Sequence, residues 1–157
     1  VQVVHVEREH VEMFTSVASG FRNLKKLEVD CCELDAAFAA ALSSLTLQRL
    51  YLFNCEHIAI AVAGLPATLR ELRISMPRDR DLSLPSLPRS LTSLDLSFCY
   101  FTAIPPVVLA LPHLIRLNLY ANSRIPPQVV FNASGERVEV FGMCQPVRHN
   151  KDGSLYR

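Results

Sequence analysis

Cysteine is the residue type with the widest chemical range in this chain, at positions 31, 32, 55, 99 and 144. An odd number of cysteines with no CxxC pair is typical of a protein from a reducing compartment. A zinc site would need two pairs of Cys or His at ligand spacing, and the sequence has none. We therefore expect no metal site and an intracellular protein, in the cytoplasm or in an organelle.

Catalytic motifs are missing as well. The sequence contains no GxSxG, HExxH, P-loop or GxGxxG pattern. Its 5 glycines are too scattered to build a phosphate-binding loop. No apolar run reaches the ~18 residues that a membrane-spanning helix needs. These observations predict a protein with no enzymatic activity, no cofactor and no membrane span.

A repeated apolar pattern determines which side chains come together. Each unit has apolar residues at its first, fourth and sixth positions, and a new unit begins every 22 or 23 residues. Recurrence in register predicts a repeated structural unit whose neighbours stack into a common core. The six units are Val1-Val4-Val6, Leu24-Leu27-Val29, Leu47-Leu50-Leu52, Leu69-Leu72-Ile74, Leu91-Leu94-Leu96 and Leu114-Leu117-Leu119.

The ninth position of most units is Cys or Asn, as in Leu91–Phe101 (LTSLDLSFCYF). The pattern resembles the LxxLxLxx(N/C)xL motif of the leucine-rich repeat family, from Val1 to about Pro127. Glu9 and Pro77 depart from the motif at this position. The resemblance implies an α/β leucine-rich repeat solenoid. It would have a short, curved parallel β-sheet on the concave face and helical or irregular returns on the convex face.

The ninth residue has a structural explanation. It turns inward where the strand ends and serves backbone groups left without partners there. This predicts a structural ladder of side chains along the stack. The alternative is a reactive thiol, but a buried free cysteine is usually inert. The predicted ladder consists of Cys32, Cys55, Cys99 and Asn122.

The segments between the strands differ from one another. Asp35–Leu42 predicts a short helix with Asp35 as its N-cap, and Val11–Phe21 can also be helical. Two prolines predict that Leu82–Pro88 is extended. The polar segment 77–81 is expected to protrude as a loop.

We expect three regions along the chain. Residues 1–127 hold the six repeats, and 128–143 form a capping hairpin of two strands around a Gly-containing turn. Residues 144–157 form a basic, extended tail that is ordered only on a partner. The tail residues expected to contact RNA or a partner are Arg148, Lys151 and Arg157.

The third, fifth and seventh residues of each unit should point outward from the concave face, where partners of the family usually bind. Tyr51 and Phe53 share a strand with Arg49, and exposed residues of these types dominate interface energetics. The alternative is that Arg49 and Arg73 only form ion pairs with acidic neighbours, Glu71 and Glu28. The predicted partner-binding residues are Arg49, Tyr51, Phe53, Arg73, Phe98, Arg116 and Tyr120.

Charge is unevenly distributed. The chain has a net charge of +1, but its first 35 residues carry seven acidic and four basic side chains. His5 near Glu7 and Glu28 could suggest acid–base catalysis. An open row of charges, however, provides no pocket that would shift a pKa. We therefore interpret this end as a solvated face.

These features favour a protein-interaction scaffold or adaptor that binds a protein through the concave face. The alternative is an accessory subunit of a ribonucleoprotein, in which the tail, Arg70 and the arginines listed above contact phosphates, while Tyr51 and Tyr120 stack on bases. A third hypothesis rests on the segments 65–72 and 87–94, which resemble the LPxxLxxL repeats of bacterial effector ubiquitin ligases. This chain would then be the recognition part of a larger ligase.

Overall fold

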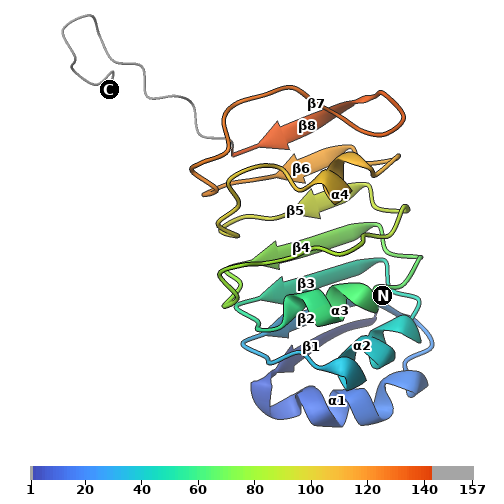
Figure 1. Ribbon diagram of the computed structural model, residues 1–157. Helices are drawn as coiled ribbons and strands as arrows, with labels where there is room; N and C mark the ends of the chain where they lie inside the picture. Colours follow the sequence, from blue (N-terminus) through green and yellow to red (C-terminus); the bar gives the residue numbers. More distant parts are fainter. Residues whose placement is uncertain (1, 143–157) are drawn as a thin grey trace, which may run out of the picture.

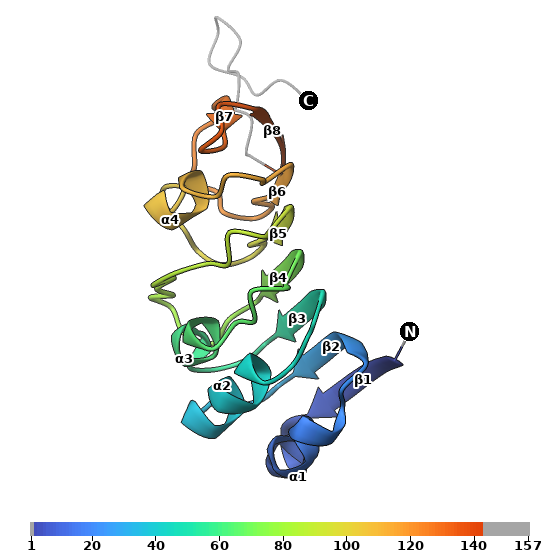
Figure 2. The same cartoon turned by 90° about the vertical axis from the view of Figure 1, so that its right-hand side faces the viewer.

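The computed structural model describes residues 2–142, which form one sheet with helices along one side (Figures 1 and 2). The predicted tail, with Arg148, Lys151 and Arg157, lies outside the described residues, as does Cys144. The helices are α1 (Val11–Val17), α2 (Ala36–Ser43), α3 (Ile58–Ala63) and α4 (Pro106–Leu109). The strands are β1 (Gln2–Glu7), β2 (Leu24–Asp30), β3 (Arg49–Phe53), β4 (Glu71–Ser75), β5 (Ser93–Asp95), β6 (Arg116–Asn118), β7 (Val130–Phe131) and β8 (Arg137–Phe141).

Strands β1 to β6 pair in parallel and in chain order. The fourth residue of each repeat unit faces the fourth residue of the next, so Leu50 of β3 pairs with Leu72 of β4. The predicted register of the units is confirmed by these pairings. A shift of one residue would move every core leucine to the opposite face of the sheet, which explains why the register is well specified.

The last two strands of the described chain form a hairpin, and one of them also joins the main sheet. β7 and β8 pair antiparallel, and β8 also pairs in parallel with β6, where Leu117 faces Val140. The step from Leu117 to Val140 equals the step from Leu94 to Leu117. β8 therefore extends the parallel sheet by one strand, a role that the sequence analysis did not anticipate.

The helices follow local signals. The Asp35 carboxylate accepts a hydrogen bond of 2.8 Å from the Phe38 amide, which confirms Asp35 as the N-cap of α2. Helix α1 and the 3-10 turn Ala18–Gly20 occupy the segment predicted to be helical, and 82–88 contains no helix, as its prolines require. Helices α3 and α4 were not predicted, since each is only one or two turns long.

The core lies between the sheet and the return segments. The apolar fourth and sixth residues of the strands meet leucines, valines and Phe38 from the returns in one continuous cluster, which extends from Val6 to Val138. Figure 2 shows all four helices on the same side of the sheet. The opposite side carries no helix in the described chain, and we call it the open face.

The chain turns sharply where each strand ends. The eighth residue of five successive units has a left-handed backbone, with φ between 49° and 60° at Cys31, Asn54, Met76, Phe98 and Ala121. None of these is glycine, although left-handed conformations usually cost other residues free energy. This turn directs the ninth residue into the core and the eighth side chain toward solvent.

Candidate partner-binding site

At the centre of the open face, the side chain of Tyr51 of β3 makes cation–π contacts and a hydrogen bond with residues of the neighbouring strands. Lys26 of β2 and Arg73 of β4 lie over its ring, with the charged groups each 4.5 Å from the ring centroid. The Tyr51 hydroxyl donates a 2.9 Å hydrogen bond to Glu71. Only 8% of Tyr51 is exposed, so its prediction as an exposed aromatic was wrong. Neighbouring strands supply the long side chains that cover it.

The surroundings of Tyr51 also change its acidity. Burial and the hydrogen bond to Glu71 both raise the pKa of Tyr51, because each disfavours the phenolate. Tyr51 therefore stays neutral and acts as a donor. The position of Tyr51 suits a role in ordering Glu71 and Arg73. It suits insertion into a partner less well.

The interpretation that the arginines only pair with carboxylates holds in part. Arg73 forms a 3.0 Å ion pair with Glu71, which is on the same strand. Arg49 forms no ion pair within residues 2–142. Glu28 pairs with Lys26 at 2.6 Å instead of with an arginine. Arg49 is therefore a cation that the described fold leaves without a counter-charge.

The aromatic candidates separate into two groups. Phe53 lies next to Tyr51, with ring centroids 6.4 Å apart. Phe98 and Tyr120 form a second pair, 5.4 Å apart and edge-to-face. Tyr120 is 58% exposed, unlike Tyr51. Ser75 and Ser97 follow Phe53 in the same row, so the seven predicted residues do not form one continuous patch.

A hollow of about 570 Å³ lies on the open face over β3 to β6 and reaches Phe141 of β8. Arg49, Arg73 and Arg116 line it, as the sequence analysis expected for a binding surface. Arg70 lines it too, although the sequence analysis considered Arg70 only for RNA. It is the second residue of its unit, a position outside the three predicted outward rows. We call this feature the arginine hollow and define it by Arg49, Arg70, Arg73 and Arg116.

The N-terminal end of the open face carries carboxylates. Glu28 is close to His5 at 3.5 Å as well as to Lys26. The hydrogen bond from Lys26 is the largest influence on Glu28 and lowers its pKa, so the carboxylate stays charged. A general acid needs the opposite shift, which supports the interpretation of this end as a solvated face.

The predicted ladder residues all lie buried at the strand ends. The Cys55 thiol donates to the carbonyls of Phe53 at 3.1 Å and Val29 at 3.6 Å. Asn122 donates to the carbonyl of Leu96 at 2.8 Å and accepts from the Phe101 amide at 2.9 Å. Burial raises the pKa of Cys32 to about 11 and that of Cys55 and Cys99 to about 12. These thiols are hydrogen-bond donors, and their raised pKa values disfavour nucleophilic chemistry.

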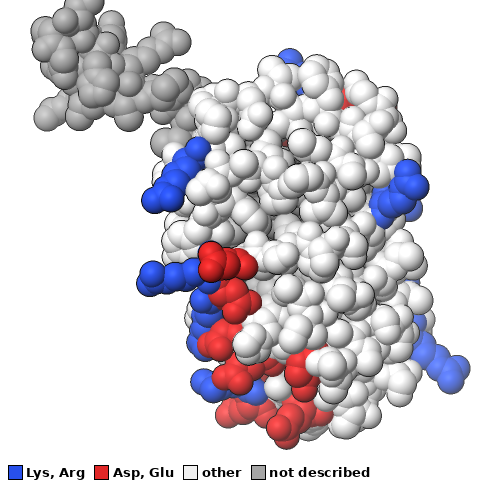
Figure 3. Space-filling view, in the orientation of Figure 1, with Lys and Arg blue, Asp and Glu red and all other residues white. Residues whose placement is uncertain are grey.

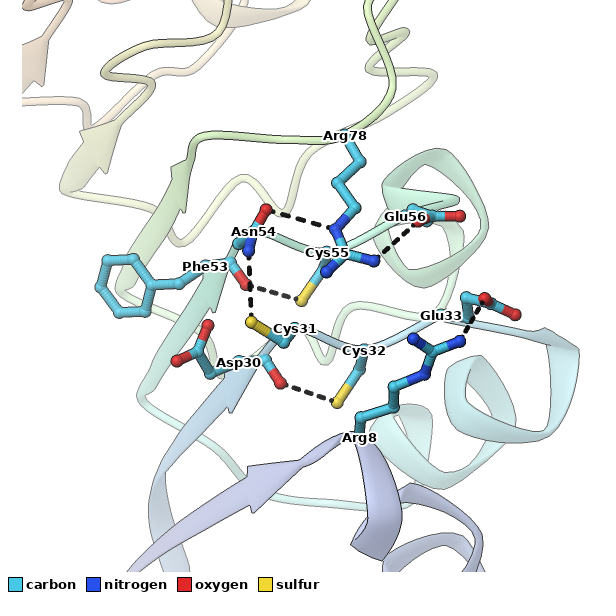
Figure 4. A network of polar contacts seen from close by, with 10 residues as sticks. All are labelled: Arg8, Asp30, Cys31, Cys32, Glu33, Phe53, Asn54, Cys55, Glu56 and Arg78. Atoms are coloured by element: carbon cyan, nitrogen blue, oxygen red, sulfur yellow. Dashed lines mark hydrogen bonds and ion pairs between the residues drawn. The ribbon is translucent and has the colours of Figure 1, made fainter.

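A polar network runs along the strand ends beside this ladder (Figure 4). Arg78 forms a 2.9 Å ion pair with Glu56 and a hydrogen bond with Asn54. Asp79 accepts a hydrogen bond from the Ile58 amide at the start of α3. The segment 77–81 therefore folds back onto the preceding unit, and its prediction as a protruding loop was wrong. Charge complementarity with that unit holds it there.

Neither a metal site nor a membrane helix is found in the described part of the chain. No group of three or more His, Cys, Asp or Glu residues among residues 2–142 is arranged to hold a metal ion. No helix there has the length and apolar character to cross a membrane.

Comparison with known proteins identifies one family. Residues 90–111 match the model of the family described as Leucine Rich Repeat. No curated protein and no solved structure matches the chain. The matched segment contains β5, the Cys99 position and α4, the same unit in which the sequence motif is clearest. Leucine-rich repeats generally mediate protein–protein interaction and are typically not enzymes.

Proposed function

Because the chain contains a leucine-rich repeat, we propose that it is a non-enzymatic adaptor that binds a protein partner through the open face of its sheet. The proposal includes a solenoid architecture, in which the open face is the concave surface. Its support is the regular pairing of the strands in chain order.

The observation that carries this proposal is the pair Phe98–Tyr120. Tyr120 exposes 58% of its surface, although an aromatic ring gains from burial. Phe98 contacts it edge-to-face, from a residue whose backbone is left-handed with φ 57°. Rigid, exposed aromatic pairs are frequent interface hot spots, and truncation of one often costs ~2 kcal/mol or more of binding free energy.

The ladder supports an intracellular location for this adaptor. Cys32, Cys55 and Cys99 use their thiol hydrogens in the strand-end hydrogen bonds, so the fold depends on their reduced form. A reducing compartment would maintain that form.

Two alternatives remain. A subunit of a ribonucleoprotein is favoured by Arg49 and Arg70, which have no ion pair within the described residues. A recognition part of a larger ubiquitin ligase is a narrower form of the adaptor hypothesis, since it would bind its substrate through the same face.

Site-specific photocrosslinking tests the proposal. A photoreactive amino acid at position 120 should crosslink to a defined protein in source-cell lysate, with or without nuclease. The same amino acid at position 60 on the helical side, where Ile60 is 42% exposed, should not crosslink to it. A Phe98→Ala/Tyr120→Ala variant should weaken capture through an affinity tag by about tenfold or more. Equal crosslinking at positions 60 and 120, or capture that nuclease abolishes, would contradict the proposal.

A further inference from the structure

The arginine hollow contains two carboxylates, and both are already engaged by neighbours. Glu71 accepts from the Tyr51 hydroxyl at 2.9 Å and from Arg73 at 3.0 Å. Asp95 accepts from the Ser97 amide at 2.9 Å and from the Asn118 side chain at 3.0 Å. The negative charge in the hollow is thus held in fixed hydrogen bonds within the sheet.

The positive charge in the hollow exceeds what these carboxylates neutralise. Four arginines line it, against Glu71 and Asp95. Arg73 pairs with Glu71, and Arg116 pairs with Glu139 of β8 at 3.4 Å. Arg49 and Arg70 make neither an ion pair nor a side-chain hydrogen bond with residues 2–142. Thr92 and Ser93 line the same hollow and add hydroxyl groups beside these two guanidinium groups.

Three of the return segments add no charge to the helical side. The return segments 36–47, 58–69 and 101–115 contain no Lys, Arg, Asp or Glu. Figure 3, in the orientation of Figure 1, shows a broad area without charged residues over the middle of the helical side, with acidic residues gathered at its lower end, near α1. These three segments therefore offer no charged side chain to a charged partner.

We propose that the arginine hollow binds an acidic segment of the partner protein, with carboxylates placed between Arg49 and Arg70. This inference rests on the proposed function, because it specifies the chemistry of what the open face binds. Guanidinium groups form paired hydrogen bonds with carboxylates, and a hollow next to structured neighbours restricts their motion. The acidic end of the face, with Glu7, Glu28 and Asp30, then orients the segment by repelling its negative charges.

Several observations favour an acidic peptide over RNA. The hollow extends from β3 to Phe141 of β8, roughly 19 Å over four strand spacings of about 4.8 Å, and the acidic end lies in line with it. A nucleic acid chain that continued across the sheet would meet like charge there. The ring of Tyr51, which the RNA hypothesis needs for stacking, is covered by Lys26 and Arg73 and is only 8% exposed.

Peptide binding to the full chain tests the inference. The probes are fluorescein-labelled deca-glutamate, deca-glutamine and deca-uridine RNA, followed by fluorescence anisotropy at about 0.15 M ionic strength, where the Debye length is about 8 Å. We expect deca-glutamate to bind, deca-glutamine not to bind and the RNA to bind more weakly than deca-glutamate. An Arg49→Gln/Arg70→Gln variant should weaken deca-glutamate binding by about tenfold or more.

The matched control removes the same charge elsewhere. Arg22→Gln/Arg89→Gln changes two exposed arginines that do not line the hollow, and it should leave binding within about twofold, since distant exposed charges are screened. Arg49 is half-buried, whereas Arg70 is exposed. The single Arg70→Gln variant therefore keeps the test valid if the double variant folds poorly. No binding of deca-glutamate, equal loss in both double variants, or tighter binding of the RNA would overturn the inference.

The crosslinking experiment separates this inference from the proposed function. A partner that crosslinks at position 120 and is captured equally well by Arg49→Gln/Arg70→Gln overturns the acidic-segment inference and leaves the open-face function standing. If no partner crosslinks at position 120, the proposed function fails, whatever the peptides do.

Discussion

Asn122 occupies in the sixth unit the position that Cys32, Cys55 and Cys99 occupy in earlier units. All four donate to backbone carbonyls at the strand ends, but only Asn122 also accepts a hydrogen bond, from the Phe101 amide. An amide has donor and acceptor atoms, whereas a thiol is a weak donor and a weak acceptor. Asn is therefore the stronger bridge at this position.

Replacement of Asn122 by Ala should lower the free energy of unfolding by about 1–3 kcal/mol, because the Leu96 carbonyl and the Phe101 amide lose their partner in the core. Urea unfolding followed by circular dichroism measures this change. Asn122→Cys is the matched control and should cost less, since Cys serves the same position in other units. If Asn122→Cys lowered the free energy of unfolding as much as Asn122→Ala does, the hydrogen bonds would not explain why Asn stabilises this position.

The thiols should differ in reactivity. Cys31 is half-buried, and its sulfur accepts from Asn54, whereas Cys32, Cys55 and Cys99 are buried with raised pKa values. At pH 8, iodoacetamide should modify Cys31 in the native protein and spare these three until the chain is unfolded. Mass spectrometry of digested protein measures the modification. Rapid native labelling of Cys55 or Cys99 would contradict their structural role.

The same pKa values imply a pH dependence of stability. Folding raises the pKa of Cys55 and Cys99 from about 9 to about 12, so the folded state holds these protons more tightly than the unfolded chain does. Their contribution is complete below pH 9 and is lost as the pH rises toward 12. A Cys55→Ala/Cys99→Ala variant, less stable at pH 8, should show a shallower decline of unfolding free energy over this range.

At the scale of elements, helices α2 and α3 pack closely because of one glycine. A Cβ at Gly64, which follows α3, would collide with the backbone carbonyl of Ala39 in α2. Helices α2 and α3 can thus pack this closely only because residue 64 has no side chain.

Gly64→Ala should therefore destabilise the protein by about 1–3 kcal/mol, the usual cost of overpacking. Thermal and urea unfolding measure the effect. Gly20→Ala is the control, since a Cβ there meets no atom within 4 Å and the backbone has no positive φ. It should be neutral or slightly stabilising. Equal effects of the two substitutions would mean that the contact with Ala39 relaxes without cost.

At the scale of the whole molecule, one core connects all the strands. Buried residues from Val6 to Val138 form one cluster, and no described strand has an apolar face separate from it. Neighbouring units share this core, so the loss of packing at one end is transmitted through the contacts between successive strands.

We expect Leu27→Ala in β2 and Leu117→Ala in β6 each to lower the free energy of unfolding by about 2–5 kcal/mol, since both leucines are fully buried. Each variant should unfold in one transition, with coincident curves from circular dichroism and tyrosine fluorescence. Separate transitions for the two probes would indicate that the N-terminal and C-terminal units unfold independently.

The strand register, the helix cap at Asp35 and the side of the sheet to which each leucine belongs could be predicted from the amino-acid sequence alone. These features follow from a local period, because apolar residues at the fourth and sixth positions have to reach one core. The strand of β8 was predicted as part of the capping hairpin, but its place in the parallel sheet was not, because Arg137 and Gly142 replace the apolar residues at the first and sixth positions of that unit.

Which outward side chains remain available to a partner could not be predicted in this way and follows from the packing between strands. Tyr51 and Tyr120 both stand in outward rows, yet one is covered by Lys26 and Arg73 and the other is open. Likewise, Arg73 and Arg49 differ in whether a carboxylate lies within reach. Exposure and charge pairing depend on the lengths and rotamers of side chains, whether from the same strand, as in Arg73 and Glu71, or from a neighbouring strand, as in Lys26 over Tyr51. No local period encodes them.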